Sequence, residues 1–122
     1  MIDLLLSETN RSKYYLKYIL NNRIKINQII YYSKKKKDLY KLIQEKKLLN
    51  KTLHVKSNSI NTKIIDNIFY NKKKKYKIIY SGYSGEMVKS DTLLKNNLHH
   101  FHSGDLPLFK GSTTIFYTIA MK

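Results

Sequence analysis

The feature that most constrains the fold of this chain is the alternation of short apolar runs with amphipathic segments. The runs are rich in Leu, Ile and Tyr, which predicts buried β-strands, and the segments between them carry apolar residues at helical spacing. We expect strands at residues 2–6, 26–32, 52–55, 76–81 and 98–102. Because strands that alternate with helices form βαβ units, the sequence predicts a doubly wound α/β fold with a mainly parallel sheet covered on both faces.

The predicted helices lie between these strands and after the last one. The first covers residues 14–21 and places Leu16 and Ile19 on one face. We expect a second helix through Leu39, Leu42 and Ile43 to about residue 49, a third with Ile64, Ile65, Ile68 and Phe69 as its apolar face, a short one near residues 89–94, and one that begins near Thr113. A chain of 122 residues without internal repeats is expected to form one domain, residues 1–122.

The formal net charge of +16 invites a nucleic-acid interpretation. However, Arg11 and Arg23 are the only arginines among the 24 basic residues, and arginine is the residue that recognises phosphates and bases through paired hydrogen bonds. Solvated surface lysine in a chain biased toward Lys, Ile, Asn and Tyr is the simpler interpretation. A small basic nucleic-acid-associated protein, or a non-catalytic interaction protein, remains the alternative function.

The sequence also carries signals about the compartment. The chain has no cysteine, so it has no disulfide framework and no thiolate metal site. The apolar run at residues 2–6 is too short for a signal peptide, and no stretch approaches the roughly 20 apolar residues of a membrane span. We expect a soluble, cytoplasmic protein.

Chemistry-bearing side chains concentrate in residues 98–114, which hold three of the four histidines and the one proline. The predicted fifth strand ends there at His102 and runs into a loop rich in turn residues, and Ser112 or Thr113 is suited to cap a following helix. A reactive side chain at a strand end that faces a helix N-terminus is well placed to stabilise developing negative charge. This segment is therefore the candidate active site.

The same histidines invite a metal-site interpretation. On a strand, His100 and His102 point to one face and His99 to the other. Two imidazoles supply half a zinc site, and the third ligand would be Asp105 or the distant His54. We expect no metal, and a merely structural histidine pair is a further alternative.

The spacing of His102, Leu106-Pro107 and Gly111 resembles a family pattern, Asn-x-His-x-Ser-Leu-Leu-Pro-x-x-x-Gly. That pattern is typical of the 10-formyltetrahydrofolate-dependent formyltransferases, which include methionyl-tRNA, glycinamide-ribonucleotide and nucleotide-sugar formyltransferases. Two departures stand out, because His100 occupies the usual asparagine position and Gly104-Asp105 replace Ser-Leu. The ending Gly-Ser-Thr-Thr is most similar to formyltransferase-like proteins of surface-sugar pathways.

The resemblance implies a Rossmann-like sheet with strand order 3-2-1-4-5. Ligands of such sheets bind beyond the carboxyl ends of the strands, where the order reverses, so residues 7–11 and 82–86 should face one crevice. The loop at residues 82–85 has its own simpler interpretation, a turn in which glycine supplies positive φ. By resemblance, this loop lines the folate pocket.

The resemblance also implies an activity, the transfer of a formyl group from 10-formyltetrahydrofolate to an amine. The acceptor would be a nucleotide-linked amino sugar of a surface glycan or an aminoacyl-tRNA. The implied catalytic residues are His102, for the oxyanion and proton transfer, and His100, as a hydrogen-bond donor in place of asparagine. The implied cofactor-binding residues are Gly82, Tyr83, Gly85, Leu106 and Pro107.

Dinucleotide binding is the rival for a fold of this class. It needs a Gly-x-Gly-x-x-Gly loop after the first strand, where the backbone approaches a pyrophosphate. Residues 7–12 contain no glycine. The sequence therefore argues against NAD or NADP.

The family also uses an aspartate well downstream of the histidine, and that position would fall after Lys122. The resemblance covers nearly the whole chain but about the first half of a formyltransferase domain. We therefore expect a truncated formyltransferase N-terminal part that is inactive as an isolated chain. The open edge of its fifth strand, without lysine or proline in residues 98–102, favours self-association.

Overall fold

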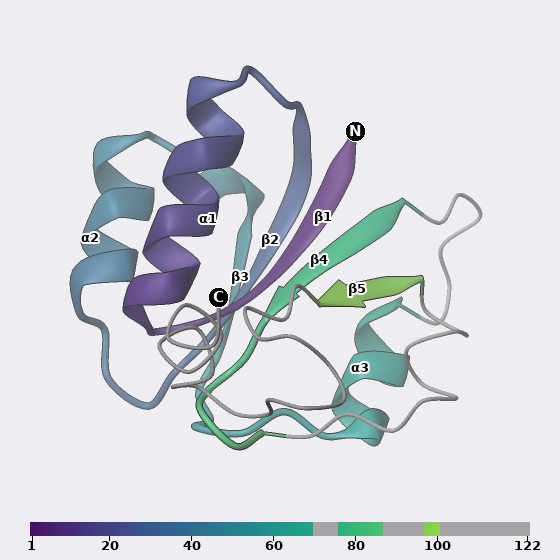
Figure 1. Cartoon of the computed structure of the whole chain (residues 1–122). Coiled ribbons are helices and arrows are strands. Elements are labelled where there is room, and N and C mark those ends of the chain that lie inside the picture. The colour runs from purple at the N-terminus through teal and green to yellow at the C-terminus, as the bar shows by residue number, and fades with distance from the viewer. Residues whose placement is uncertain (70–75, 87–96, 101–122) are drawn as a thin grey trace, which may run out of the picture.

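The computed structural model describes residues 1–69, 76–86 and 97–100. Its five strands are all parallel and are arranged in the order β3-β2-β1-β4-β5 (Figure 1). The strands are β1 (Ile2–Ser7), β2 (Ile26–Tyr32), β3 (Thr52–Val55), β4 (Lys77–Ser81) and β5 (Leu98–His100), and the helices are α1 (Asn10–Asn21), α2 (Asp38–Glu45) and α3 (Thr62–Phe69), with a 3₁₀ turn at Leu49–Lys51. The predicted parallel α/β fold is confirmed, and the strand order agrees with the one that the resemblance implies.

The sheet has helices on both faces: α1 and α2 lie on one and α3 on the other (Figure 1). Alternation along β1 divides its side chains between two cores. Leu4 and Leu6 pack with the residues of α1 and α2, and Leu5 packs with those of α3. The chain moves from β1 to β3 in one direction and returns past β1 to β4, so right-handed crossovers put α3 on the opposite face.

Two helices end through a residue in the left-handed region that is not glycine. Arg23 (φ 55) follows α1 and Lys47 (φ 56) follows α2. After α2, the main-chain N–H of Leu48 donates to the carbonyl of Ile43 at 3.0 Å, which closes the last turn. The second helix therefore ends at Glu45 instead of near residue 49.

Several predicted elements lie outside the described residues. These are the helices near residues 89–94 and from residue 113, and the last two residues of the predicted fifth strand. Within the part of the chain that the structure describes, none of the helices has the length and apolar character that crossing a bilayer requires.

We expect Leu5→Ala to lower the free energy of unfolding by about 2–5 kcal/mol, because Leu5 is completely buried in the central strand. Urea unfolding followed by circular dichroism measures the change. Leu53→Ala is the control, since Leu53 lies on the edge strand β3 and is 51% exposed, and its effect should stay within about 0.5 kcal/mol. Equal losses in the two variants would contradict the assigned core.

Candidate functional site

The loops that follow β1 and β4 meet at the carboxyl edge of the sheet. Arg11, in the first turn of α1, donates through Nε to Ser81 Oγ at 3.3 Å and through Nη2 to the carbonyl oxygen of Gly82. The main-chain N–H of Glu8 donates to the hydroxyl of Tyr83 at 3.4 Å. Because β1 and β4 are neighbours at the point where the strand order reverses, the predicted approach of residues 7–11 to residues 82–86 is confirmed.

A cluster of serine and threonine hydroxyl groups lies where these two loops meet. Ser12 Oγ lies 2.9 Å from both Thr9 Oγ1 and Ser81 Oγ, and Ser7 Oγ lies 3.3 Å from Thr9 Oγ1. Thr9 also caps α1 by accepting from the main-chain N–H of Ser12 at 3.2 Å. This first-turn amide is thus occupied by the protein itself, which agrees with the argument against a dinucleotide phosphate loop.

Glu8, directly after β1, caps a helix that begins 30 residues later, at Asp38. Its carboxylate accepts from the main-chain N–H groups of Lys37 at 2.8 Å, Leu39 at 2.9 Å and Tyr40 at 3.3 Å, and from the hydroxyl of Tyr31 at 2.9 Å. Lys37, the N-cap residue of α2, makes no side-chain cap bond of its own. The carboxylate therefore satisfies free first-turn amides and the positive end of the helix dipole.

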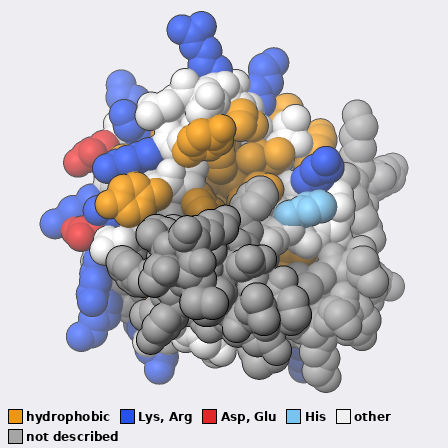
Figure 2. Space-filling model, viewed as in Figure 1, with side chains coloured by type: hydrophobic (Ala, Val, Ile, Leu, Met, Phe, Trp, Pro, Cys, Tyr) orange, Lys and Arg blue, Asp and Glu red, His pale blue; other side chains and the backbone are white. Residues whose placement is uncertain are grey.

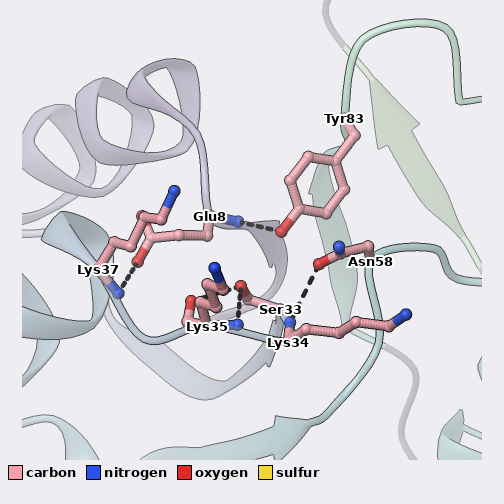
Figure 3. Close-up of a pocket in the computed structure, with 7 residues that line it drawn as sticks. All are labelled: Glu8, Ser33, Lys34, Lys35, Lys37, Asn58 and Tyr83. Carbon is pink, nitrogen blue, oxygen red and sulfur yellow. Dashed lines mark hydrogen bonds between the residues drawn. The ribbon is translucent and has the colours of Figure 1, made fainter.

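Beside Glu8 lies a cavity of about 290 Å³, which we call the lysine cavity. It is lined by Glu8, Ser33, Lys34, Lys35, Lys37, Asn58 and Tyr83 (Figure 3). The first wall comes from the segment after β2, where the main-chain N–H of Lys34 donates to Asn58 Oδ1 at 3.1 Å. Tyr83 forms the opposite wall, held edge-on against the ring of Tyr32 with the centroids 5.6 Å apart.

Glu86 ends the described part of the loop after β4 and lies against two tyrosines. Its Oε1 accepts from the hydroxyl of Tyr32 at 2.5 Å and from the hydroxyl of Tyr80. Burial is the main cause that raises the pKa of both tyrosines well above the usual value, and the neighbouring carboxylate raises the pKa further. Glu86 Oε2 is buried and has no hydrogen-bond partner among the described residues.

The two glycines of this loop serve different purposes. Gly85 has φ +77, which confirms the predicted turn with positive φ. At Gly82, a Cβ would overlap the Tyr80 hydroxyl and lie 2.8 Å from Glu86 Oε1, so glycine there allows close packing. Both glycines and Tyr83 thus shape the loop at the crevice.

The described histidines lie at opposite edges of the sheet. On β5, His100 Nδ1 lies 3.2 Å from the carbonyl oxygen of Tyr80, and the two rings are 5.5 Å apart. On β3, His54 Nε2 lies 2.9 Å from the carbonyl oxygen of Ser33. Four strand spacings of about 4.8 Å separate these edges, so His54 does not complete a metal site with His100.

Other predicted site residues lie outside the described residues. These are His102, Leu106 and Pro107, together with Asp105 of the metal alternative. Within residues 1–69, 76–86 and 97–100, the structure brings no three metal-ligating side chains together. His99, which neighbours His100, is exposed and has Nε2 3.0 Å from Asn97 Oδ1.

Comparisons with known proteins add no relative: no family model, no curated protein and no solved structure matches this chain. Any assignment of function therefore depends on the motif and on the geometry at the carboxyl edge. Sequence reasoning placed the right loops there but missed the roles of Glu8 and Glu86. The available signal was weak, namely an acidic residue in each loop that flanks the reversal of strand order.

We expect Glu8→Ala to lower the free energy of unfolding by about 2–3 kcal/mol, because it leaves the first-turn amides of α2 without their acceptor and removes the closer of the two acceptors of the Tyr31 hydroxyl. Urea unfolding measures the change. Glu45→Ala removes an exposed carboxylate from the other end of α2 and should shift the same quantity by less than about 0.5 kcal/mol. A loss no larger for Glu8→Ala than for Glu45→Ala would show that the cap is unimportant.

The raised tyrosine pKa values predict a loss of stability at high pH. The unfolded chain releases tyrosine protons near pH 10.0, whereas folded Tyr32 retains its proton. The stabilising contribution is therefore complete below pH 10 and declines as the pH rises above it, with a slope that approaches about 1.4 kcal/mol per pH unit for each such group. In unfolding measured between pH 8 and pH 11, roughly the range around the tyrosine pKa, Tyr32→Phe should reduce this slope by the contribution of one group, because Tyr80 retains its own. The exposed Tyr18→Phe should retain it, and identical slopes in both variants would contradict the assignment.

Proposed function

We propose that this chain is formyltransferase-like and takes part in the transfer of a formyl group from 10-formyltetrahydrofolate to an amine. The observation that carries the proposal is the position of His100. It lies at the carboxyl end of β5, next to the strand whose following loop lines the crevice. In a parallel sheet this edge is where ligands bind, and the motif resemblance supplies the reaction class.

The hydrogen bond of His100 supports a specific role for its ring in the proposed reaction. A carbonyl oxygen only accepts, so the proton of a neutral His100 ring is on Nδ1, facing Tyr80. Nε2 is then the acceptor nitrogen of the neutral ring. His100 in this tautomer is suited to receive a proton from an attacking amine, rather than to donate as the family asparagine does.

When bound, 10-formyltetrahydrofolate supplies a formyl carbon whose oxygen gains negative charge as the amine adds. By resemblance, His102 donates a hydrogen bond to that oxygen, and His100 Nε2 accepts the amine proton. In this proposal His102 stabilises the negative charge and His100 removes the proton. The net result is a new bond between the formyl carbon and the acceptor nitrogen and cleavage of the bond between that carbon and N10 of the folate. The proton taken from the acceptor amine passes to N10, which leaves as the amine of tetrahydrofolate.

The described part of the crevice has features that fit a folate. Glu86 Oε2 is a buried acceptor with no partner among the described residues, and a pterin ring is rich in N–H donors. Tyr83 belongs to the same loop, where its carbonyl oxygen accepts from the main-chain N–H of Glu86 at 3.1 Å, and Gly82 and Gly85 set the path of the backbone. Leu106 and Pro107 join this group by resemblance. A cytoplasmic location and self-association through the β5 edge remain part of the proposal.

The proposal is tested with the chain joined to the downstream part of a formyltransferase domain, which supplies the family aspartate. The assay contains 10-formyltetrahydrofolate and a panel of amines that includes nucleotide-linked amino sugars and aminoacyl-tRNA. Formylated product is detected by mass spectrometry. We expect His102→Ala to slow transfer roughly 10²–10³-fold through loss of the oxyanion donor. His100→Ala should slow transfer at a pH where a neutral imidazole can accept the amine proton, and should have less effect in acid, where an imidazole is already protonated. His99→Ala, at an exposed position, should leave the rate unchanged.

A binding measurement accompanies the rate measurement, because a chain that resembles part of a formyltransferase domain should bind folate even when turnover is slow. Calorimetry with 5-formyltetrahydrofolate should show weaker binding by Tyr83→Ala and parent-like binding by Tyr18→Ala, on the exposed side of α1. Transfer by His102→Ala at the parent rate would overturn the histidine assignment. Absence of folate binding by the parent chain would overturn the proposed function.

A further inference from the structure

The lysine cavity carries positive charge that the protein does not neutralise. Lys34, Lys35 and Lys37 line it, and none of them forms an ion pair with a described residue. Like charges that line one hollow repel one another, and their combined field attracts an anion to it. An arrangement of this kind is stabilised by a bound anion.

Glu8 lines the same cavity but does not cancel this charge. Its carboxylate already accepts three main-chain N–H groups of the α2 N-terminus and the Tyr31 hydroxyl. A carboxylate so satisfied is a fixed cap, and its charge is balanced by the helix end. The lysine side chains therefore remain available for an external partner.

The fourth lysine of the run behaves differently and provides an internal comparison. Lys36 is absent from the cavity lining, and its Nζ lies 4.6 Å from the centre of the Tyr40 ring. Within one sequence of four lysines, three therefore line the cavity and one is engaged by an aromatic ring. The charge run alone does not distinguish them; the fold does.

We propose that the lysine cavity binds the diphosphate group of a small-molecule ligand. Its volume of about 290 Å³ is at the lower limit of ligand pockets, which suits a compact polar group more than a whole ligand. Lysine ammonium groups are suited to phosphate oxygens as point charges. The exposed amide of Asn58, beside Lys34, and the hydroxyl of Tyr83, on the opposite wall, add polar groups (Figure 3).

The location of the cavity connects it to the formyl acceptor. Glu8 and Tyr83 belong both to its lining and to the two loops that meet at the crevice. An amine carried on a nucleoside diphosphate can place its diphosphate here and extend toward β5. This step, which selects a nucleotide-linked amino sugar as the acceptor class, rests on the proposed function, whereas diphosphate binding itself does not.

The test is calorimetric titration of the full chain with inorganic pyrophosphate at constant ionic strength. The cavity variant carries Lys34→Gln, Lys35→Gln and Lys37→Gln. The matched variant carries Lys36→Gln, Lys46→Gln and Lys63→Gln, at exposed positions away from the cavity. Each variant lowers the net charge of +16 by three, so a general effect of charge weakens both equally.

We expect the parent chain to bind one pyrophosphate, the cavity variant to bind it roughly tenfold more weakly or worse, and the matched variant to retain the parent's affinity. Equal weakening of both variants, or no binding by the parent, would overturn the proposal. A short RNA is titrated in parallel. If RNA binding depends on the three cavity lysines and pyrophosphate binding does not, the site is a nucleic-acid contact and the diphosphate assignment is wrong.

The pyrophosphate titration contains no folate and no amine, so its outcome is separate from the formyl-transfer assay. Absence of pyrophosphate binding by the parent chain, together with intact formyl transfer, overturns the cavity assignment alone. Intact pyrophosphate binding without folate binding overturns the formyl-transfer role alone. In the transfer assay itself, the cavity variant should raise KM for nucleotide-linked amino sugars and leave kcat unchanged, because the cavity lysines bind a part of the acceptor that does not react.

Discussion

The fold depends on the double pairing of β1. This strand bonds to β2 on one side and to β4 on the other, and residues 3–7 are buried throughout. A buried strand with both edges paired leaves no main-chain group unsatisfied, and it has to be apolar on both faces. The reversal of strand order at β1 then follows from placing later strands on its second edge. Everything at the carboxyl edge, from Glu8 to Tyr83, is positioned by that arrangement.

The elements dominated by local pattern were predictable from the sequence. The bounds of β2 and β3 were predicted as they occur, because β-branched and aromatic runs flanked by charged or turn residues carry a strong strand signal. The predicted end of α2 was wrong because the helix stops before Lys47, which adopts the left-handed conformation. Glycine or asparagine is the usual residue in that conformation after a helix. A lysine at that position gives no sequence signal that the helix ends there.

The contacts of the candidate site were not predictable in the same way. Glu8 caps α2 and Glu86 joins Tyr32 and Tyr80 across distances in sequence that no spacing rule covers. Such contacts arise when a parallel sheet brings separate strand ends to one edge. The sequence could place the loops there, by the rule for ligand sites in doubly wound sheets, but not the partner of each side chain. The roles of His102, Leu106 and Pro107 stay predictions, since these residues lie outside the described part of the chain.

β1 and β4 are neighbours in the sheet but lie far apart in the sequence, and this has a consequence for synthesis on the ribosome. β1, β2 and β3 emerge first, together with α1 and α2, and their contacts are local enough to form early. The second edge of β1 is paired, and the Leu5 face is covered, only after α3 and β4 have been synthesised. Glu8 can contact Tyr83 only when the chain is 75 residues longer. During that interval the nascent chain presents an unpaired apolar edge to its neighbours. The carboxyl-edge crevice is therefore completed only after the first three strands have been made, and until then this apolar edge is open to wrong pairing.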